Sequence, residues 1–139
     1  MAVTLTRVVT FRADHRFWVP EWSPERNREA FGALSDPPGH GHDYRAGVTV
    51  SGPLDDRGMI MDLAELDRIM REEITDALDG RHINLVLPGF AYGKTLPTCE
   101  ALAAHYYRVI ERRLPAGVRL ARIRMAEDDT LYADCTGTT

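Results

Sequence analysis

Two long amphipathic stretches lie in the middle of this 139-residue chain, with a pair of β-rich stretches before them and another pair after them. The first begins at Asp62, where an aspartate can cap a helix, and apolar residues recur at helical spacing up to Leu78. The second opens at Pro97-Thr98 and is stopped by Pro115. The order strand, strand, helix, helix, strand, strand predicts an α+β fold in which a four-stranded antiparallel sheet carries both helices on one face.

The four predicted strands cover residues 3–13, 42–51, 118–126 and 131–135, and the last two form a hairpin around Asp128-Asp129. A proline-rich excursion separates the first two strands, and Ser23-Pro24 within it predicts a short helix over residues 24–31. Residues 59–61 read as a brief extended piece, and the segment from Gly80 to Gly93 as a loop. With no repeat or linker, we expect one domain spanning residues 1–139.

The charge balance and the cysteine content narrow the class of protein. Lys and Arg total 17 against 21 Asp and Glu, a mildly acidic balance that argues against a nucleic-acid binder. No apolar run approaches the ~20 residues that cross a bilayer, and the first residues lack the pattern of a signal peptide. Cys99 and Cys135 form neither a disulfide framework nor a CxxC pair. We therefore expect a cytoplasmic protein without nucleic-acid or membrane partners.

Three of the five histidines suggest a metal site. His40 and His42 stand two residues apart where the second strand begins, so both rings can point to one side. His15 ends the first strand, which is the natural hairpin partner of the second. Three neutral imidazoles with one open position are typical of catalytic zinc. The alternative is that the His-x-His spacing is an accident of a surface loop.

Four motifs, in order along the chain, resemble those of one family. They are Phe11-x-Ala13-x-His15, Phe31-Gly32 followed by Pro37-x-Gly39-His40-Gly41-His42-x-Tyr44, the segment Gly58 to Leu66, and Pro97-Thr98-Cys99-Glu100. Together they resemble the 6-pyruvoyl-tetrahydropterin synthases and the related 6-carboxy-tetrahydropterin synthases. The resemblance implies a T-fold (tunnelling fold), Zn²⁺ on His15, His40 and His42, and a homohexamer of two trimers with pterin sites between subunits.

The resemblance also implies a reaction that removes triphosphate from 7,8-dihydroneopterin triphosphate and rearranges its side chain. A carboxylate can anchor the ring by accepting two hydrogen bonds from its 2-amino pyrimidinone edge. Glu127 follows Ile123 and Met125 on one strand face and fits this role, unless it is a solvated residue of an acidic turn. Backbone N–H groups of Thr98 and Cys99, at the start of the second helix, are candidate donors to the ring.

The catalytic cysteine of the family is absent at both of its usual positions. Leu34 stands six residues before His40, and Asp36 stands four before it. Asp36 can accept a proton, although an aspartate before two prolines is also a common turn residue. Relative to the family's Asp-His relay, either two residues are inserted between Asp79 and His82, or Gly80 takes the position of the histidine. Asp79 and His82 can still meet across a tight turn, or His82 can be an exposed loop residue.

These features predict a zinc-dependent lyase acting on 7,8-dihydroneopterin triphosphate or a related pterin, with chemistry altered from that of the family. The candidate catalytic residues are Asp36, Asp79 and His82, and the candidate substrate-binding residues are Glu127, Thr98 and Cys99. The alternative from another class is a non-catalytic pterin- or purine-binding subunit that retains the pocket.

Overall fold

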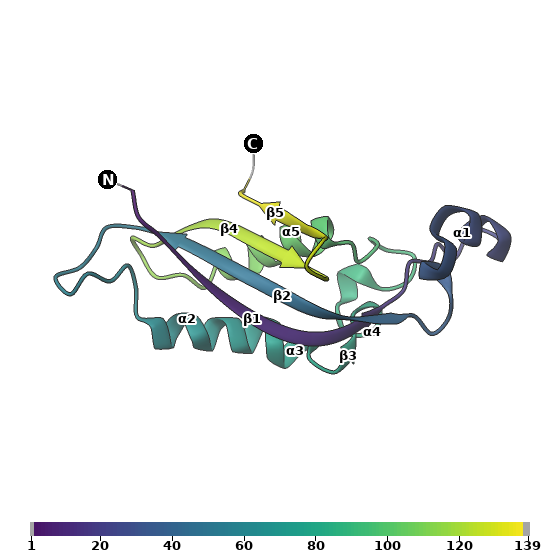
Figure 1. Cartoon of the computed structure of the whole chain (residues 1–139), viewed down its shortest axis with the longest axis horizontal. Helices are drawn as coiled ribbons and strands as arrows, with labels where there is room; N and C mark the ends of the chain where they lie inside the picture. Colours follow the sequence, from purple (N-terminus) through teal and green to yellow (C-terminus); the bar gives the residue numbers. More distant parts are fainter. Residues whose placement is uncertain (1, 138–139) are drawn as a thin grey trace.

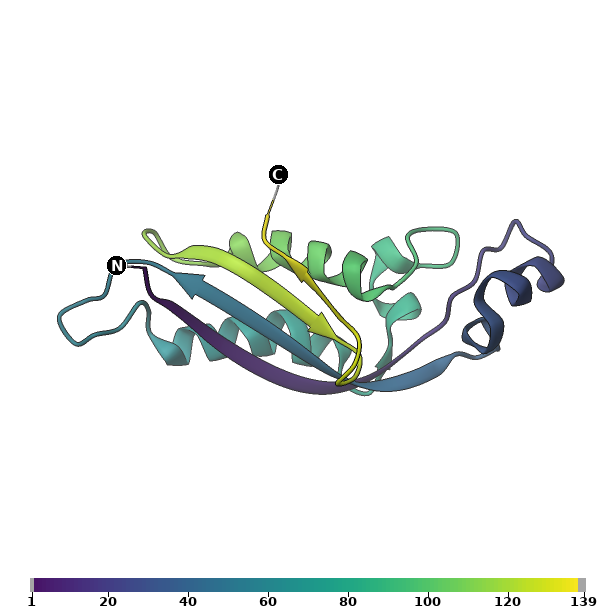
Figure 2. The same cartoon turned by 45° about the horizontal axis from the view of Figure 1, so that its top comes forward.

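A mixed five-stranded sheet with helices packed on one of its faces forms the body of the protein (Figures 1 and 2). The computed structural model describes residues 2–137. The strand order is β3-β1-β2-β4-β5. The strands are β1 (Thr4–His15), β2 (His40–Ser51), β3 (Arg81–His82), β4 (Arg119–Ala126) and β5 (Tyr132–Cys135). The helices are α1 (Pro24–Phe31), α2 (Leu63–Met70), α3 (Asp76–Leu78), α4 (Ile83–Val86) and α5 (Cys99–Glu111).

The predicted count of four strands and the purely antiparallel sheet were wrong, because β3 adds a fifth strand parallel to β1. This strand arises from contacts with a distant part of the chain. The Gly80 N–H donates to the Arg12 carbonyl at 2.7 Å, and the Asp79 carboxylate accepts from the Arg12 N–H at 2.9 Å. These two bonds hold the turn after α3 beside the end of β1. Two residues are too few to produce an alternating pattern in the sequence.

The first long helix is capped as predicted but is not a regular α-helix throughout. The Asp62 carboxylate accepts from the Ala64 N–H at 3.0 Å and starts α2. Residues Arg71–Thr75 form a π-helical turn, η2, between α2 and α3. Thr98 caps α5 through its hydroxyl, which accepts from the Ala101 N–H at 3.1 Å. The predicted loop before α5 contains α4 and a short 3-10 turn, η3 (Pro88–Phe90).

The core lies between the sheet and its helices. One face of β1, β2 and β4 packs against α2, α3 and α5, and the alternate residues of these strands are buried. The largest fully buried side chains include Tyr44, Leu66, Tyr106, Ile123 and Met125. Burying side chains of this size contributes about 1.5–3 kcal/mol each relative to exposure. The core therefore fixes the sheet whose far end carries the histidines.

β1 and β2 form one long antiparallel pair, and each extends two residues further toward the histidines than predicted. β1 continues to His15 and β2 begins at His40, which pair directly across the ladder. Residues 16–39, here called the arm, connect the two strands and carry α1 and the 3-10 turn η1 (Gly32–Ser35) (Figure 1). Stacking of Trp22 on Phe31, 5.9 Å apart, packs the arm on itself.

Within residues 2–137, no helix has both the length and the apolar character that crossing a membrane requires.

Candidate metal centre

The structure brings His15, His40 and His42 together on the helix-facing side of the sheet. His15 pairs with His40 in the ladder, and Ala13 pairs with His42, so all three rings lie on the same side. The His15 and His40 Nε2 atoms are 2.9 Å apart, and one ring nitrogen from each residue lies within 4.8 Å of the others. The register of the β1–β2 hairpin therefore brings the three histidine rings together, as the spacing of these residues in the sequence suggested.

His15 is the most deeply placed of the three, with 2% of its surface exposed. Its Nδ1 lies 3.0 Å from the Pro97 carbonyl oxygen, which can only accept, so this nitrogen carries the proton. The Tyr44 hydroxyl lies 2.9 Å from the same Nδ1. Nε2 is therefore the unprotonated nitrogen, and its lone pair points into the cluster. Contacts of this kind fix the orientation of a metal-binding imidazole.

Burial keeps all three imidazoles neutral. It lowers the pKa of His15 to about 3, and the neighbouring His40 and His42 act in the same direction. Burial is also the main cause that lowers the pKa of His40 and of His42. His40 Nδ1 and His42 Nε2 are buried without a hydrogen-bond partner among the described residues. Three neutral imidazoles whose ring nitrogens converge fit a zinc ion, which would replace the proton shared between His15 Nε2 and His40 Nε2 and prefers nitrogen ligands of this type.

Gly39 allows β2 to begin so close to β1. Its φ is +125°, and a Cβ there would lie 2.6 Å from the His15 carbonyl oxygen and 3.0 Å from His82 Nε2. No larger residue fits without moving the backbone beside two of these rings. Gly39 is thus part of what places His40.

Glu127 directly follows β4, and its carboxylate lies beside the three histidines. Its Oε2 is 2.8 Å from His42 Nε2 and 3.7 Å from His15 Nε2, and its side chain is 13% exposed. Burial raises the pKa of Glu127, and Asp128 adds to the rise. The solvated-turn alternative therefore does not describe this side chain. The neighbouring Asp128 instead caps the hairpin turn, accepting from the N–H groups of Thr130 and Leu131.

At the start of α5, Thr98 caps the helix and Cys99 carries a buried thiol. The Thr98 N–H donates to the Leu96 carbonyl at 2.8 Å, and the hydroxyl of Thr98 serves the helix cap. Cys99 is 4% exposed, and burial followed by the Glu127 carboxylate raises its pKa to about 11. The thiol therefore stays protonated at neutral pH and is a poor nucleophile there.

Asp79 and His82 lie in one turn but bind different partners. The Asp79 carboxylate accepts from the Arg12 backbone, whereas His82 Nε2 donates to the Pro38 carbonyl at 2.8 Å. His82 Nδ1 is buried without a partner among residues 2–137. Its ring lies next to Gly39, beside the histidine cluster. His82 is therefore close to the candidate centre, while the Asp79 carboxylate anchors β1.

Asp36 ends the 3-10 turn of the arm, and its carboxylate pairs with Arg28 of α1 at 2.6 Å. Its side chain is about half exposed. This placement is that of a turn residue with a salt bridge. Sequence reasoning missed the contacts of Tyr44 and Pro97 with His15. Tyr44 had a signal, since it lies two residues after His42 on the same strand face; a loop carbonyl has none.

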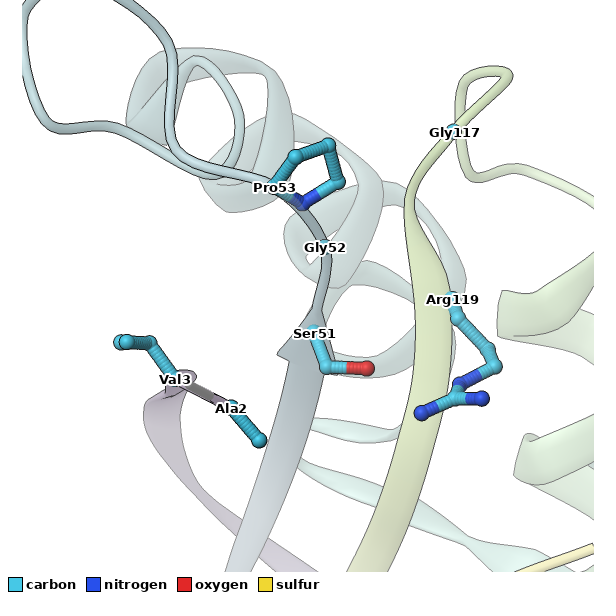
Figure 3. Close-up of a pocket in the computed structure, with 7 residues that line it drawn as sticks. All are labelled: Ala2, Val3, Ser51, Gly52, Pro53, Gly117 and Arg119. Carbon is cyan, nitrogen blue, oxygen red and sulfur yellow. The ribbon is translucent and has the colours of Figure 1, made fainter.

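Two hollows differ in what lines them. One of about 350 Å³ lies beside His42 and Glu127 and also touches Arg12, Arg45 and Asp128. Another of about 430 Å³ lies at the opposite end of the sheet, between the start of β1, the end of β2 and the turn before β4 (Figure 3). Among residues 2–137, Arg119 is the one charged side chain that lines the second hollow. The hollow beside the histidines therefore has more groups that can bind a ligand or exchange a proton than the hollow at the opposite end of the sheet.

Comparisons with known proteins agree over almost the whole chain. The family model of 6-pyruvoyl tetrahydropterin synthase matches residues 4–138. The 6-pyruvoyl tetrahydrobiopterin synthase of Homo sapiens is 36% identical over 126 residues, covering 90% of this chain and 85% of the human protein. The 6-pyruvoyl tetrahydropterin synthase structure of Caenorhabditis elegans superposes with a TM-score of 0.87 at 28% identity, covering 99% and 97% of the two chains.

A more distant structure shares the fold. It is that of a Plasmodium vivax 6-pyruvoyltetrahydropterin synthase, described as a catalytic-residue mutant in which cysteine replaces glutamate. It superposes with a TM-score of 0.67 at 11% identity, covering 97% of each chain.

Proposed function

Because this chain belongs to the 6-pyruvoyl tetrahydropterin synthase family, we propose that it is a zinc-dependent lyase acting on a reduced pterin. The proposed substrate is 7,8-dihydroneopterin triphosphate or a close relative, from which triphosphate is eliminated as the side chain rearranges. The convergence of the His15, His40 and His42 ring nitrogens carries this proposal. Zinc would polarise side-chain oxygens of the substrate and acidify the adjacent C–H bonds.

Binding of the heterocycle would fall to Glu127 and the start of α5. The Glu127 carboxylate can accept two hydrogen bonds from the 2-amino pyrimidinone edge, which makes it the proposed anchor. The Thr98 N–H already donates to the Leu96 carbonyl and the Thr98 hydroxyl caps α5, so the backbone N–H of Cys99 is the better donor of the pair.

Proton transfer would fall to His82 in the first place. Its Nε2–H is held by Pro38, so its buried Nδ1 is the nitrogen that can accept a proton. Asp79 supports this geometry by holding the preceding turn to β1. Asp36 is the second candidate. It stands at one of the two usual positions of the family's cysteine and carries a carboxylate that can accept a proton. Asp36 would have to release Arg28 to act.

The non-catalytic binder remains the competing function, since neither Leu34 nor Asp36 supplies the thiol of the family. Loss of a positioned acid or base costs roughly two to four powers of ten in rate. Prolonged incubation with 7,8-dihydroneopterin triphosphate and zinc, followed by mass spectrometry, separates the two functions. Stoichiometric release of triphosphate supports the lyase, and bound but intact substrate supports the binder.

The metal assignment has its own test. Protein purified without chelator should contain one zinc per chain, measured by plasma mass spectrometry, and His40→Ala should lose it. Zinc content unchanged by His40→Ala would remove the basis of the lyase proposal. If zinc is present, His82→Gln and Asp36→Asn then identify the proton carrier, because only loss of that group suppresses turnover without changing the zinc content.

Assembly is the remaining part of the proposal. β3 covers only Ala13 and Asp14, so most of β1 is an unpaired edge, and β5 at the other edge has four residues. The face of the sheet opposite the helices is also bare (Figure 2). Exposed edges of this kind are normally covered. Association would cover these edges, and the family resemblance implies its form, so we propose a homohexamer of two trimers; sedimentation equilibrium should give six times the mass of the chain.

A further inference from the structure

The Glu127 carboxylate is placed among the histidines by two separate constraints. The backbone is held by the hairpin, because the Glu127 N–H donates to the Leu131 carbonyl at 3.1 Å. The side chain then follows Ile123 and Met125 on the helix-facing side of β4. These two residues are fully buried, so the carboxylate is directed inward by the packing of its own strand.

The contact between Glu127 and His42 is short, yet it does not have hydrogen-bond geometry. Oε2 lies 2.8 Å from His42 Nε2, but this nitrogen has no hydrogen-bond partner among the described residues. The oxygen therefore lies away from the direction in which a ring N–H would point. Two atoms with lone pairs that approach in this way are arranged like neighbouring ligands of a common centre.

The separations match that arrangement. Zinc binds nitrogen and carboxylate oxygen at about 2.0–2.2 Å, which puts neighbouring ligand atoms of a tetrahedral site about 3.3 Å apart. The distances from Oε2 to His42 Nε2 and His15 Nε2 are 2.8 and 3.7 Å and bracket this value. The charge fits as well, since burial lowers the pKa of the three rings and a cation among them would compensate the carboxylate of Glu127, whose side chain is 13% exposed.

We propose that Glu127 is the fourth ligand of the metal when no heterocycle is bound, and that a bound pterin draws the carboxylate away. This rests on the proposed function, which supplies the three-histidine metal site and the anchoring role of Glu127. A carboxylate that accepts two hydrogen bonds from the ring edge uses both of its oxygens. The same side chain therefore closes the resting site and opens it when substrate arrives.

The test uses the full-length protein loaded with Co²⁺, whose visible absorption reports the ligands of the ion. The probe is pterin itself, which lacks the side chain that could reach the metal. In the wild type, pterin should change the Co²⁺ spectrum as the carboxylate leaves. In Glu127→Gln, the spectrum should already differ without pterin, and competition with a chelator should show zinc bound about ten-fold or more weakly.

Glu100→Gln is the matched control, because Glu100 is an exposed glutamate in the first turn of α5. It should keep the wild-type zinc affinity and the wild-type spectral response. Wild-type zinc affinity and spectrum in Glu127→Gln would overturn the fourth-ligand role. An unchanged Co²⁺ spectrum when pterin fluorescence reports binding to the wild type would overturn the displacement. A wild-type protein that binds no zinc would instead overturn the proposed function.

Discussion

The metal-free protein should lose stability in mild acid because of His15. The pKa of this ring is about 3 in the folded chain and 6.5 in the unfolded chain, so below pH 6.5 only the unfolded chain takes up the proton. The stability present above pH 6.5 is therefore lost progressively as the pH falls toward 3. Each pH unit in that window is worth about 1.4 kcal/mol for one group. The free energy of unfolding should fall by about 2 kcal/mol between pH 7.5 and pH 5.

Urea denaturation of the protein in excess chelator at the two pH values measures this loss. His40 and His42 add to it, since their pKa values are also lowered, while the raised pKa of Glu127 offsets part of it at the acidic end. His15→Gln should remove about 2 kcal/mol of the pH dependence. If that variant does not fold, the ring resonances of His15 in the wild-type protein serve instead. Titration of that ring with a midpoint near 6.5 would refute the reasoning.

Three further substitutions test the architecture of the centre and the core. Tyr44→Phe removes the hydroxyl beside His15 Nδ1 and should weaken zinc binding about ten-fold in chelator competition; unchanged affinity would leave Pro97 as the sole orienting contact. Gly39→Ala should lose zinc at unchanged far-UV circular dichroism, because its Cβ meets the His15 carbonyl, whereas Gly89→Ala, with open space around it, should not. Leu66→Ala should cost about 2–5 kcal/mol in urea denaturation, and an equal cost for the exposed Leu63→Ala would contradict the assigned core.

Features that depend on neighbouring residues in the sequence could be predicted. Asp62 and Thr98 cap their helices because a side chain reaches the N–H groups two or three residues ahead. The convergence of the histidines could also be predicted, because register in a hairpin relates His15 to His40 across a ladder that the strand pattern indicates.

Features created by packing between distant segments could not be predicted. β3 exists because the turn after α3 binds the Arg12 backbone, a contact between residues 67 positions apart in the sequence. The π-helical turn leaves the apolar spacing of its helix almost unchanged, so the pattern does not reveal it. The pairing of Asp36 with Arg28 is local, eight residues apart, but it depends on the turn after α1, and nothing in the order of the residues indicates the path of that turn.

The two ends of the arm are flanked by His15 and His40, which pair with each other across the ladder. His15 is the last residue of β1 and His40 is the first of β2, so a cation held by both would be a reversible cross-link at the neck of the loop formed by residues 16–39. The ladder between β1 and β2 already closes that loop in the folded chain, so the cation would reinforce a closure that is lost only on unfolding. The bound cation should therefore raise the free energy of unfolding, whereas substitutions far out on the arm, such as at the Trp22–Phe31 stack, should leave its affinity unchanged.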